Sequence, residues 1–383
     1  MRYYIIAGEA SGDLHGSNLI KQIKLLDQQA VIRCWGGNLM EEAGAELIKH
    51  YRDLAFMGFA EVVKNLPTIF KNIRFCKADI LAFQPDCLIL IDYPGFNLRI
   101  AEWAKQEGIK VIYYISPQVW AWKAGRVRKM KECIDKMLVI LPFEKDYYQQ
   151  QWNWEVDYVG HPLMEVIEAK KQELGYGPDN IFPLPNSKKI ALLPGSRKQE
   201  IAKKLPIMLE LAKLFPDQEF VVAEAPGQDS AFYEPFLKPY QNVASVKNNT
   251  YELLLESKAA LVTSGTATLE TALLGIPEIV CYKGSKISYE IAKRLVKIKY
   301  ISLVNLIMDK LVVKELIQDQ LNTVNLEKEL NELLHNTSKQ EQLRKDYQQL
   351  QAILSKGGHA SAQAAKIIHQ YLLEDQPPQL TLK

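Results

Sequence analysis

Three stretches of this sequence combine small residues with charged or hydroxylated side chains. The first, Gly8-Glu9-Ala10-Ser11-Gly12-Asp13-Leu14-His15-Gly16, follows an apolar run at the N-terminus. Glycines let a backbone approach a ligand closely, and a helix that starts there offers free N–H groups to an anion. The structural alternative is a tight turn in which Asp13 caps the next helix. The presence of Glu9, Asp13 and His15 together favours a binding role.

The second and third stretches carry groups that suit a diphosphate. In Leu193-Pro194-Gly195-Ser196-Arg197, we expect Ser196 to cap a helix and Arg197 to offer a planar charged fork. The third stretch is Thr263-Ser264-Gly265-Thr266-Ala267-Thr268-Leu269-Glu270, and we expect a helix from Thr268 to Leu274 to begin within it. Hydroxyls and backbone N–H groups therefore converge at the start of this helix. Glu270 could accept both hydroxyls of a ribose. A solvated Arg197, and a helix start complemented by Glu270, are the alternatives.

One carboxylate stands where a general base would. Asp92 follows the apolar run Cys87–Ile91, and a carboxylate at the mouth of an apolar sheet is suited to accept a proton. Capping of the next turn is the alternative. His161 and His359 lack metal-ligand spacing to another His, Asp or Cys, so structural or hinge roles are favoured. We predict neither a metal centre nor a cofactor.

A fourth segment, between Leu54 and Lys77, mixes large apolar side chains with cations and few anions. Such a segment suits the surface of an anionic bilayer, where apolar groups insert and cations meet phosphates. A core-facing helix with a solvated basic face is the alternative. The residues expected to dock are Met57, Phe59, Val62, Val63, Lys64, Leu66, Phe70, Lys71 and Arg74.

The chemistry-bearing stretches require elements that bring them together. Short apolar runs alternate with longer amphipathic segments, which is typical of βαβ units and a parallel sheet. A first helix is expected from about Leu14, and a linker at Gly175–Ser187 separates two such halves. Ligands of these sheets bind beyond the carboxyl ends of the strands. The runs read as strands are Tyr3–Ala7, Cys87–Ile91, Val111–Ile115 and Met137–Ile140, then Ile190–Leu193, Phe220–Ala223, Ala259–Val262 and Ile279–Tyr282.

Length and charge narrow the class of protein. A chain of 383 residues suggests two domains, and its net charge of +2 is too mild to argue for nucleic acid, although Gln118–Lys131 is aromatic and basic. Five scattered cysteines without a CxxC pair indicate idle thiols in a reducing compartment. The N-terminus lacks a signal-peptide pattern, and the chain lacks an apolar run of about 20 residues, so we expect a cytoplasmic protein.

Taken together, these stretches resemble lipid-A-disaccharide synthase, a glycosyltransferase family of the GT-B fold in Gram-negative outer-membrane biogenesis. Any one of the motifs alone would be weak, but as a set they are highly specific. They span most of the chain in the order of the family: AGEASGDLHG (7–16), DYPGFN (92–97), SPQVWAWK (116–123), YVGHPL (158–163), LLPGSRKQEI (192–201) and TSGTATLE (263–270).

The resemblance implies an inverting transfer in lipid A biosynthesis. UDP-2,3-diacylglucosamine and 2,3-diacylglucosamine 1-phosphate (lipid X) would give lipid A disaccharide 1-phosphate and UDP. The implied fold is α/β, with two Rossmann-like, doubly wound parallel-sheet domains facing across a cleft. We expect residues 1–165 to form an acceptor-binding and membrane-docking domain and residues 166–345 a UDP-sugar-binding domain. Residues 346–383 would form a helical segment that, by fold analogy, crosses back to the first domain.

Residue roles follow from the same resemblance. The catalytic carboxylate falls on Asp92, which would take the proton of the acceptor 6-hydroxyl as that oxygen attacks the anomeric carbon. Arg197 and helix dipoles would stabilise the leaving UDP, which needs no metal. The donor site would comprise Gly195, Ser196, Arg197, Ser264, Gly265, Thr266, Thr268 and Glu270, and the acceptor site Glu9, Ser11, Gly12, Asp13, His15 and Asn97.

Two positions depart from the family pattern. Many members carry a second Asp where this chain has Gly95, which strengthens the assignment to Asp92. Pro is common before Asn305, where this chain has Val304, so the role of Asn305 stays open.

The expected partners are the two acylated sugars and the cytoplasmic surface of the inner membrane, without nucleic acid; a homodimer is compatible with the resemblance. The alternatives are another UDP-sugar enzyme of this fold, such as an epimerase or a peptidoglycan-type transferase, or a non-catalytic module that binds nucleotide sugars or RNA.

Overall fold

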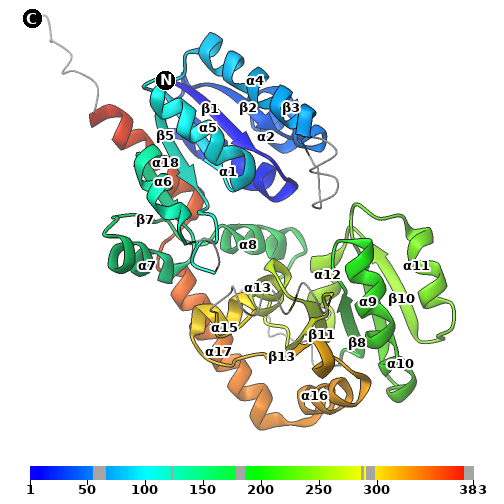
Figure 1. Cartoon of the computed structure of the whole chain (residues 1–383). Coiled ribbons are helices and arrows are strands. Elements are labelled where there is room, and N and C mark those ends of the chain that lie inside the picture. Colours follow the sequence, from blue (N-terminus) through cyan, green and yellow to red (C-terminus); the bar gives the residue numbers. More distant parts are fainter. Residues whose placement is uncertain (55–65, 122–123, 178–185, 286–288, 290–297, 375–383) are drawn as a thin grey trace, which may run out of the picture. The chain divides into compact units, whose positions relative to one another are not determined.

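The computed structural model describes residues 1–54, 66–121, 124–177, 186–285, 289 and 298–374 (Figure 1). Contacts between residues divide the chain into two compact units, which are described separately below. Unit 1 comprises Met1–Pro162 together with Leu354–Lys383, and unit 2 comprises Leu163–Ile353. Among the described helices, none is long and apolar enough to cross a membrane.

The described part of unit 1 contains a sheet of seven parallel strands in the order β3-β2-β1-β4-β5-β6-β7. Its central strands are continuous apolar runs because helices cover both faces of the sheet. The strands are β1 (Arg2–Ala7), β2 (Val31–Gly36), β3 (Glu46–His50), β4 (Cys87–Ile91), β5 (Lys110–Tyr114), β6 (Lys136–Val139) and β7 (Asp157–Tyr158).

Two hydrophobic layers enclose this sheet. One face packs against α4 (Leu66–Phe83), α5 (Pro94–Gln106), α6 (Arg126–Cys133) and α7 (Pro142–Trp152). The other packs against α1 (Ala10–Leu26), α2 (Asn38–Glu42) and the C-terminal helix α18 (Ala360–Glu374), which lies along α1. A short 3-10 helix, Tyr51–Asp53, follows β3. The start of α18 is held closely, because a Cβ atom on Gly357 would lie 2.3 Å from the backbone of Gly160.

The described part of unit 2 repeats this plan with six parallel strands in the order β10-β9-β8-β11-β12-β13. The strands are β8 (Lys189–Leu193), β9 (Glu219–Glu224), β10 (Val243–Lys247), β11 (Ser257–Thr263), β12 (Glu278–Tyr282) and β13 (Lys314–Ile317). The helices are α8 (Leu163–Glu173), α9 (Lys198–Leu209), α10 (Leu211–Leu214), α11 (Ser230–Leu237), α12 (Thr250–Leu255), α13 (Thr266–Leu273), α15 (Leu303–Met308), α16 (Thr323–His335) and α17 (Thr337–Ser355), with a 3-10 turn at Gln318–Gln320.

Each sheet has one point where the strand order reverses. In unit 1, the chain builds outward from β1 in one direction and from β4 in the other; in unit 2, the same occurs between β8 and β11. At such a point the two loops leave in opposite directions, which opens a crevice at the carboxyl ends of the strands. The stretches at residues 8–16 and 92–97 follow β1 and β4, and those at 194–197 and 263–270 follow β8 and β11.

All eight strands predicted from apolar runs are confirmed, but the flanking strands were not predicted. The strands β2, β3, β7, β10 and β13 lie towards the sheet edges and keep exposed or half-exposed positions, which breaks the apolar pattern. The start of the first helix is also corrected, because α1 begins at Ala10 rather than near Leu14. Most of the first glycine-rich stretch is therefore the first turns of a helix.

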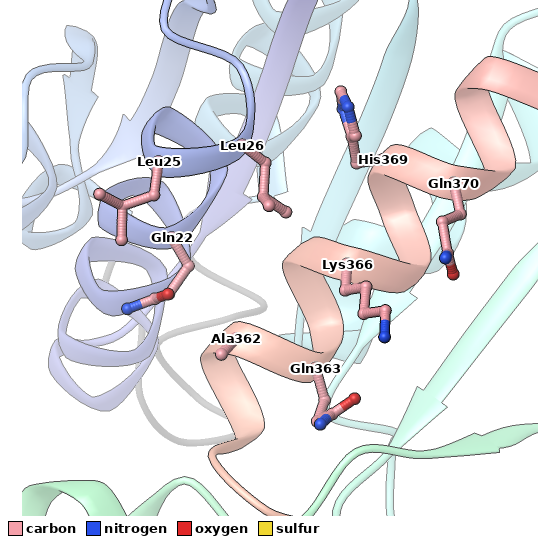
Figure 2. A pocket seen from close by; sticks show the side chains of 8 residues that line it. All are labelled: Gln22, Leu25, Leu26, Ala362, Gln363, Lys366, His369 and Gln370. Atoms are coloured by element: carbon pink, nitrogen blue, oxygen red, sulfur yellow. The ribbon is translucent and has the colours of Figure 1, made fainter.

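A groove of about 500 Å³ lies between the C-terminal half of α1 and α18. Figure 2 shows the two rows of side chains that line it, with Leu25 and Leu26 on α1 and Lys366 and His369 on α18. The groove includes no residue that the sequence predicts to act on a ligand. The candidate chemistry is at the opposite end of α1, where that helix begins.

An unpaired carboxyl group is buried at the start of β12. Glu278 is 1% exposed, and within the described residues neither of its carboxyl oxygens has a hydrogen-bond partner. It borders a cavity of about 10 Å³, which is room for about one water molecule. Burial raises the pKa of this carboxyl well above its ordinary value, so the folded protein keeps it neutral.

Replacing Glu278 by Met should therefore make the protein less sensitive to alkaline pH. In the unfolded chain this carboxyl has its ordinary pKa and loses its proton once the pH exceeds that value, whereas in the folded protein it keeps the proton. The free energy of unfolding of the wild type therefore falls as pH rises. Glu278→Met removes that loss, so the stability of the variant relative to the wild type should increase from pH 4 to pH 8. Thermal unfolding of both proteins across this range is the measurement. Parallel pH slopes would contradict the argument.

Candidate functional site

In unit 1, the turns after β1 and β4 lie side by side. The parallel register pairs Ala7 with Ile91, so Gly8 and Asp92 are the first residues beyond the paired strands. A Cβ atom on Gly8 would lie 2.3 Å from the ring of Tyr93, a distance that no side chain tolerates. Glycine is thus required at this position because the aromatic ring of the neighbouring turn covers its backbone.

The turn at Asp92 is held in an unusual backbone conformation. Asp92 and Tyr93 have φ values of 43° and 50°, and Ile115, after the adjacent strand β5, has 67°. Left-handed geometry costs a non-glycine residue about 1–3 kcal/mol, and residues of this kind concentrate at functional sites. They account for three of the eight non-glycine residues with positive φ in the described chain.

Three hydrogen bonds keep the Asp92 backbone in place. Its N–H donates to the carbonyl of Tyr114 (3.1 Å), while its own carbonyl accepts from the Tyr113 hydroxyl (2.5 Å) and from Asn97 Nδ2 (2.8 Å). Asn97 is fully buried and also donates to the carbonyl of Ile91 (3.2 Å). Asn97 therefore orients the loop that carries Asp92, a role that the sequence alone did not indicate.

The electrostatics of this turn favour proton uptake. Burial, and then the negative charge of Glu9 across the crevice, raise the pKa of Asp92 to about 6, although a backbone hydrogen bond from Tyr93 opposes the shift. A carboxyl with this pKa is ionised at neutral pH and is a stronger base than an ordinary aspartate. The geometry thus provides a poised general base.

The first turns of α1 contain residues with different surroundings. Glu9 and Ser11 are exposed, and Gly12 packs against β1, where a Cβ atom would lie 3.0 Å from Ala7. Asp13 is 4% exposed, and its carboxylate accepts from the backbone N–H groups of Gly37 (2.7 Å), Leu39 (3.2 Å) and Met40 (3.1 Å). The structural alternative, in which Asp13 caps the helix that follows the first turn, is wrong, since Asp13 lies inside α1 and caps α2.

His15 and His161 lie within electrostatic range of one another. Burial lowers the pKa of His15 to about 4, and burial together with His15 lowers the pKa of His161 to about 3. Both imidazoles are therefore neutral at physiological pH. The Nδ1 atom of His15 is buried without a hydrogen-bond partner among the described residues.

In unit 2, the turn after β8 brings an arginine to the surface. Gly195 adopts φ of 125°, which favours glycine, and the Arg197 side chain is 66% exposed, with Nη1 at 3.6 Å from Glu200 Oε1. Helix α9 has Arg197 as its N-cap residue without a side-chain capping bond, so the predicted cap by Ser196 is wrong. Ser196 is exposed, and its carbonyl accepts from Gln228 Nε2 (3.0 Å).

The turn after β11 ends in the exposed start of a helix. Gly265, with φ of 126°, is the N-cap of α13, and Gly265 and Thr266 are exposed, with Ser264 partly so. The Thr268 hydroxyl points inward and donates to the Gly265 carbonyl (2.8 Å), so it shapes the turn. The first N–H groups of a helix have no partner within that helix, which leaves them for an anion.

A tyrosine holds the carboxylate of α13. Glu270 Oε1 accepts from the hydroxyl of Tyr251 on α12 (2.8 Å), and burial raises the pKa of Glu270. Tyr251 leaves the second carboxylate oxygen for another donor. By contrast, Asn305 is fully buried, and its side-chain amide bonds Val312, Val313 and Glu315 internally, so it serves the fold.

Helix α4 carries the described part of the predicted docking segment. Phe70 and Phe75 are 54% and 49% exposed, and Lys71 and Arg74 are exposed beside them. A series of ring contacts runs from Phe75 through Trp35 and Phe96 to Tyr93, next to Asp92. Leu66 begins α4. Met57, Phe59, Val62, Val63 and Lys64 lie outside the described residues.

Two residues that fix these turns were not predicted. Tyr113 fixes Asp92 and Tyr251 fixes Glu270, yet each belongs to a run that reads as an ordinary strand or helix. Their partners lie 21 and 19 positions away in the sequence. Asn97 was predicted, but as an acceptor contact and not as the partner of the Asp92 backbone. A polar side chain inside an apolar run indicates that the residue makes a hydrogen bond. It does not indicate which residue is the partner.

Comparisons with known proteins agree with this arrangement. The family model for lipid-A-disaccharide synthetase matches residues 3–370. The lipid-A-disaccharide synthase of Geobacter metallireducens is 37% identical over 380 residues, covering 97% of each chain. Lipid-A-disaccharide synthase 1 of Legionella pneumophila (strain Lens) is 38% identical over 363 residues, covering 92% of this chain and 93% of its own.

Solved structures identify the fold. The UDP-GlcNAc 2-epimerase of Neisseria meningitidis has a TM-score of 0.67 at 16% identity, covering 98% of this chain and all of its own. A calicheamicin glycosyltransferase has a TM-score of 0.62 at 15% identity, covering 98% and 99%. These likenesses confirm the predicted GT-B fold. With the match over nearly its whole length, this chain belongs to the lipid-A-disaccharide synthetase family, the glycosyltransferases of lipid A biosynthesis.

Proposed function

We propose that this protein joins two acylated glucosamine units. The donor is UDP-2,3-diacylglucosamine, the acceptor is 2,3-diacylglucosamine 1-phosphate, and the products are lipid A disaccharide 1-phosphate and UDP. The observation that carries the proposal is the pair of strand-order reversals, each with polar loops at the carboxyl ends of its strands. Unit 1 binds the acceptor and unit 2 binds the donor.

Asp92 acts as the general base. Its carboxylate takes the proton of the acceptor 6-hydroxyl while that oxygen attacks the anomeric carbon of the donor, and the bond from that carbon to the UDP oxygen breaks. A single displacement of this kind inverts the anomeric configuration. The raised pKa of Asp92 supports this role, because a base that holds a proton more firmly drives its removal from an alcohol.

The donor is held in unit 2 by two turns on neighbouring strands. The exposed guanidinium of Arg197 and the first N–H groups of α13 meet the diphosphate, with Gly195, Ser196, Ser264, Gly265 and Thr266 forming the walls. Thr268 maintains the turn. Glu270, oriented by Tyr251, accepts the ribose hydroxyls. As UDP leaves, the same groups stabilise its growing negative charge.

The acceptor is held in unit 1 around the start of α1. The exposed side chains of Glu9 and Ser11 contact the sugar headgroup, and His15, whose buried Nδ1 has no hydrogen-bond partner among the described residues, lies behind them on α1. Gly12, Asp13 and Asn97 contribute by shaping the crevice, because their contacts are with neighbouring strands and with α2.

The experiment that tests this function is product analysis. Purified protein is incubated with UDP-2,3-diacylglucosamine and 2,3-diacylglucosamine 1-phosphate, and the products are identified by mass spectrometry. We expect equimolar disaccharide phosphate and UDP. Conversion of the donor to an epimer, or UDP release without a disaccharide, would reject the proposal.

We propose that α4 and the segment before it dock this enzyme on the inner membrane. Both substrates carry acyl chains and reside in a bilayer, so a peripheral enzyme must reach its surface. The exposed face of α4 supports docking, since it combines Phe70 and Phe75 with Lys71 and Arg74. The ring contacts from Phe75 to Tyr93 connect this face to the Asp92 turn.

Exchanging Phe70→Ser together with Arg74→Glu should weaken binding to anionic vesicles about tenfold, because both an apolar insertion and a lipid-facing charge are lost. Co-sedimentation with vesicles of phosphatidylglycerol and phosphatidylethanolamine measures the bound fraction. Val324→Ser, an exposed apolar position on α16, is the matched control. Met57→Ser with Phe59→Ser tests the preceding segment. Equal partitioning of all variants would count against docking here.

A further inference from the structure

A buried lysine lies beneath the two donor loops of unit 2. Lys204, on α9, is 2% exposed, whereas lysine side chains are almost never fully buried unless the charge is paired. Its Nζ donates to the hydroxyl of Thr263 at the end of β11, the strand next to β8. One ammonium group therefore connects the helix that follows the first donor loop to the start of the second.

The same ammonium lies directly against the backbone of the first loop. A Cβ atom on Gly195 would be 3.3 Å from Lys204 Nζ and 2.8 Å from Glu200 Oε2. Any side chain at this position would push the turn away from the charge. The absence of a Cβ thus lets the loop sit immediately over the lysine.

The charges around Lys204 are incompletely balanced. Burial lowers the pKa of Lys204, while the carboxylate of Glu200 and the thiol of Cys281 raise it. The carboxylate of Glu200 also faces Arg197, since its Oε1 is 3.6 Å from Arg197 Nη1, so its negative charge is divided between two cations. Across the described residues, Thr263 is the hydrogen-bond acceptor of this ammonium, which has three N–H groups to donate.

We propose that Lys204 is a positioning residue for a nucleoside diphosphate, which it serves by fixing Thr263 and by placing a positive charge behind both loops. The inference rests on the proposed donor site and adds to it a buried cation that lies beneath the exposed loops. A charge in a low-dielectric interior acts over several ångströms, so it attracts a diphosphate without direct contact. Its attraction increases as UDP takes up negative charge on leaving.

Comparing UDP with uridine tests this inference. Both ligands share the base and ribose, but uridine lacks the phosphates that would sense the charge. Replacing Lys204 by Met keeps an unbranched chain of similar length. We expect Lys204→Met to weaken UDP binding at least tenfold, measured by isothermal titration calorimetry, while uridine binding changes less than about twofold.

A second variant separates the charge from the hydrogen bond. Thr263→Val removes the acceptor but keeps the ammonium, so it should weaken UDP binding by only about two- to threefold. Unchanged uridine affinity in both variants also shows that unit 2 is folded. Equal losses for UDP and uridine would make Lys204 merely structural and overturn the inference, as would unchanged UDP binding.

Arg197→Ala distinguishes failure of this inference from failure of the donor assignment. Weaker UDP binding by Arg197→Ala, with no effect of Lys204→Met, would reject the lysine alone. If the wild-type protein binds UDP no more tightly than uridine, the diphosphate site itself is wrong, and the role of Lys204 falls with it.

Discussion

Asp92→Asn should lower kcat for disaccharide formation about a thousandfold, with little change in the KM for the UDP-sugar. Loss of a general base typically costs 10²–10⁴ in rate, and Asp92 belongs to unit 1, which we propose binds the acceptor rather than the donor. Asparagine is the appropriate replacement because Asp92 has φ of 43°, and asparagine adopts this conformation readily. Alanine would combine loss of the carboxylate with backbone strain. Steady-state kinetics with both acylated substrates provide the measurement.

Glu102→Gln, which changes a half-exposed carboxylate on α5 of the same unit, is the control and should keep wild-type kcat. Thermal unfolding of Asp92→Asn checks that its fold is retained. Normal turnover by a folded Asp92→Asn protein would remove Asp92 from catalysis and redirect the search for the base to Glu9.

The pH dependence of the rate examines the same assignment. A base works when ionised, so kcat/KM should fall about tenfold per pH unit below the Asp92 pKa of about 6. Glu9→Gln removes a negative neighbour that raises this pKa, so the acidic limb should move to lower pH. A limb that stays in place would show that another group titrates.

Arg197→Ala should reduce kcat/KM for the UDP-sugar about a hundredfold. A charge-assisted hydrogen bond to phosphate contributes about 2–3 kcal/mol, and the guanidinium is exposed at the start of α9, where a diphosphate can reach it. Arg197→Lys keeps the charge but loses the planar fork, so its kcat/KM should lie between those of the wild type and Arg197→Ala. Initial rates at varied donor concentration, with saturating acceptor, measure the effect.

Lys213→Ala is the matched control, because Lys213 is an exposed cation of unit 2 that pairs with Glu210 away from the donor loops. Its kinetics should equal those of the wild type. If Arg197→Ala also behaves like the wild type, Arg197 does not contact the donor, and the proposed diphosphate site loses its main cation.

The central strands and the loops after them were predictable from the sequence. A strand buried on both faces must be apolar at every position, so runs such as Cys87–Ile91 and Ile190–Leu193 identify themselves locally. Polar loops follow those runs directly. Because parallel strands end at one edge of a sheet, the position of Asp92 already indicated chemistry at that edge of the unit 1 sheet, and those of Arg197 and Glu270 indicated it for the unit 2 sheet.

What each polar residue does was decided by the tertiary structure. Asp13 caps α2, Asn97 secures the Asp92 turn, and Lys204 bonds Thr263 across two strands. The partners of Asp13 and Lys204 are distant in sequence, and hydrogen bonding between distant segments leaves no periodic trace in the chain. Asn97 lies only five residues from Asp92, but their hydrogen bond depends on the left-handed turn between them. The raised pKa of Asp92 has the same origin, because it requires the burial and the neighbouring Glu9 that only the packed sheet provides.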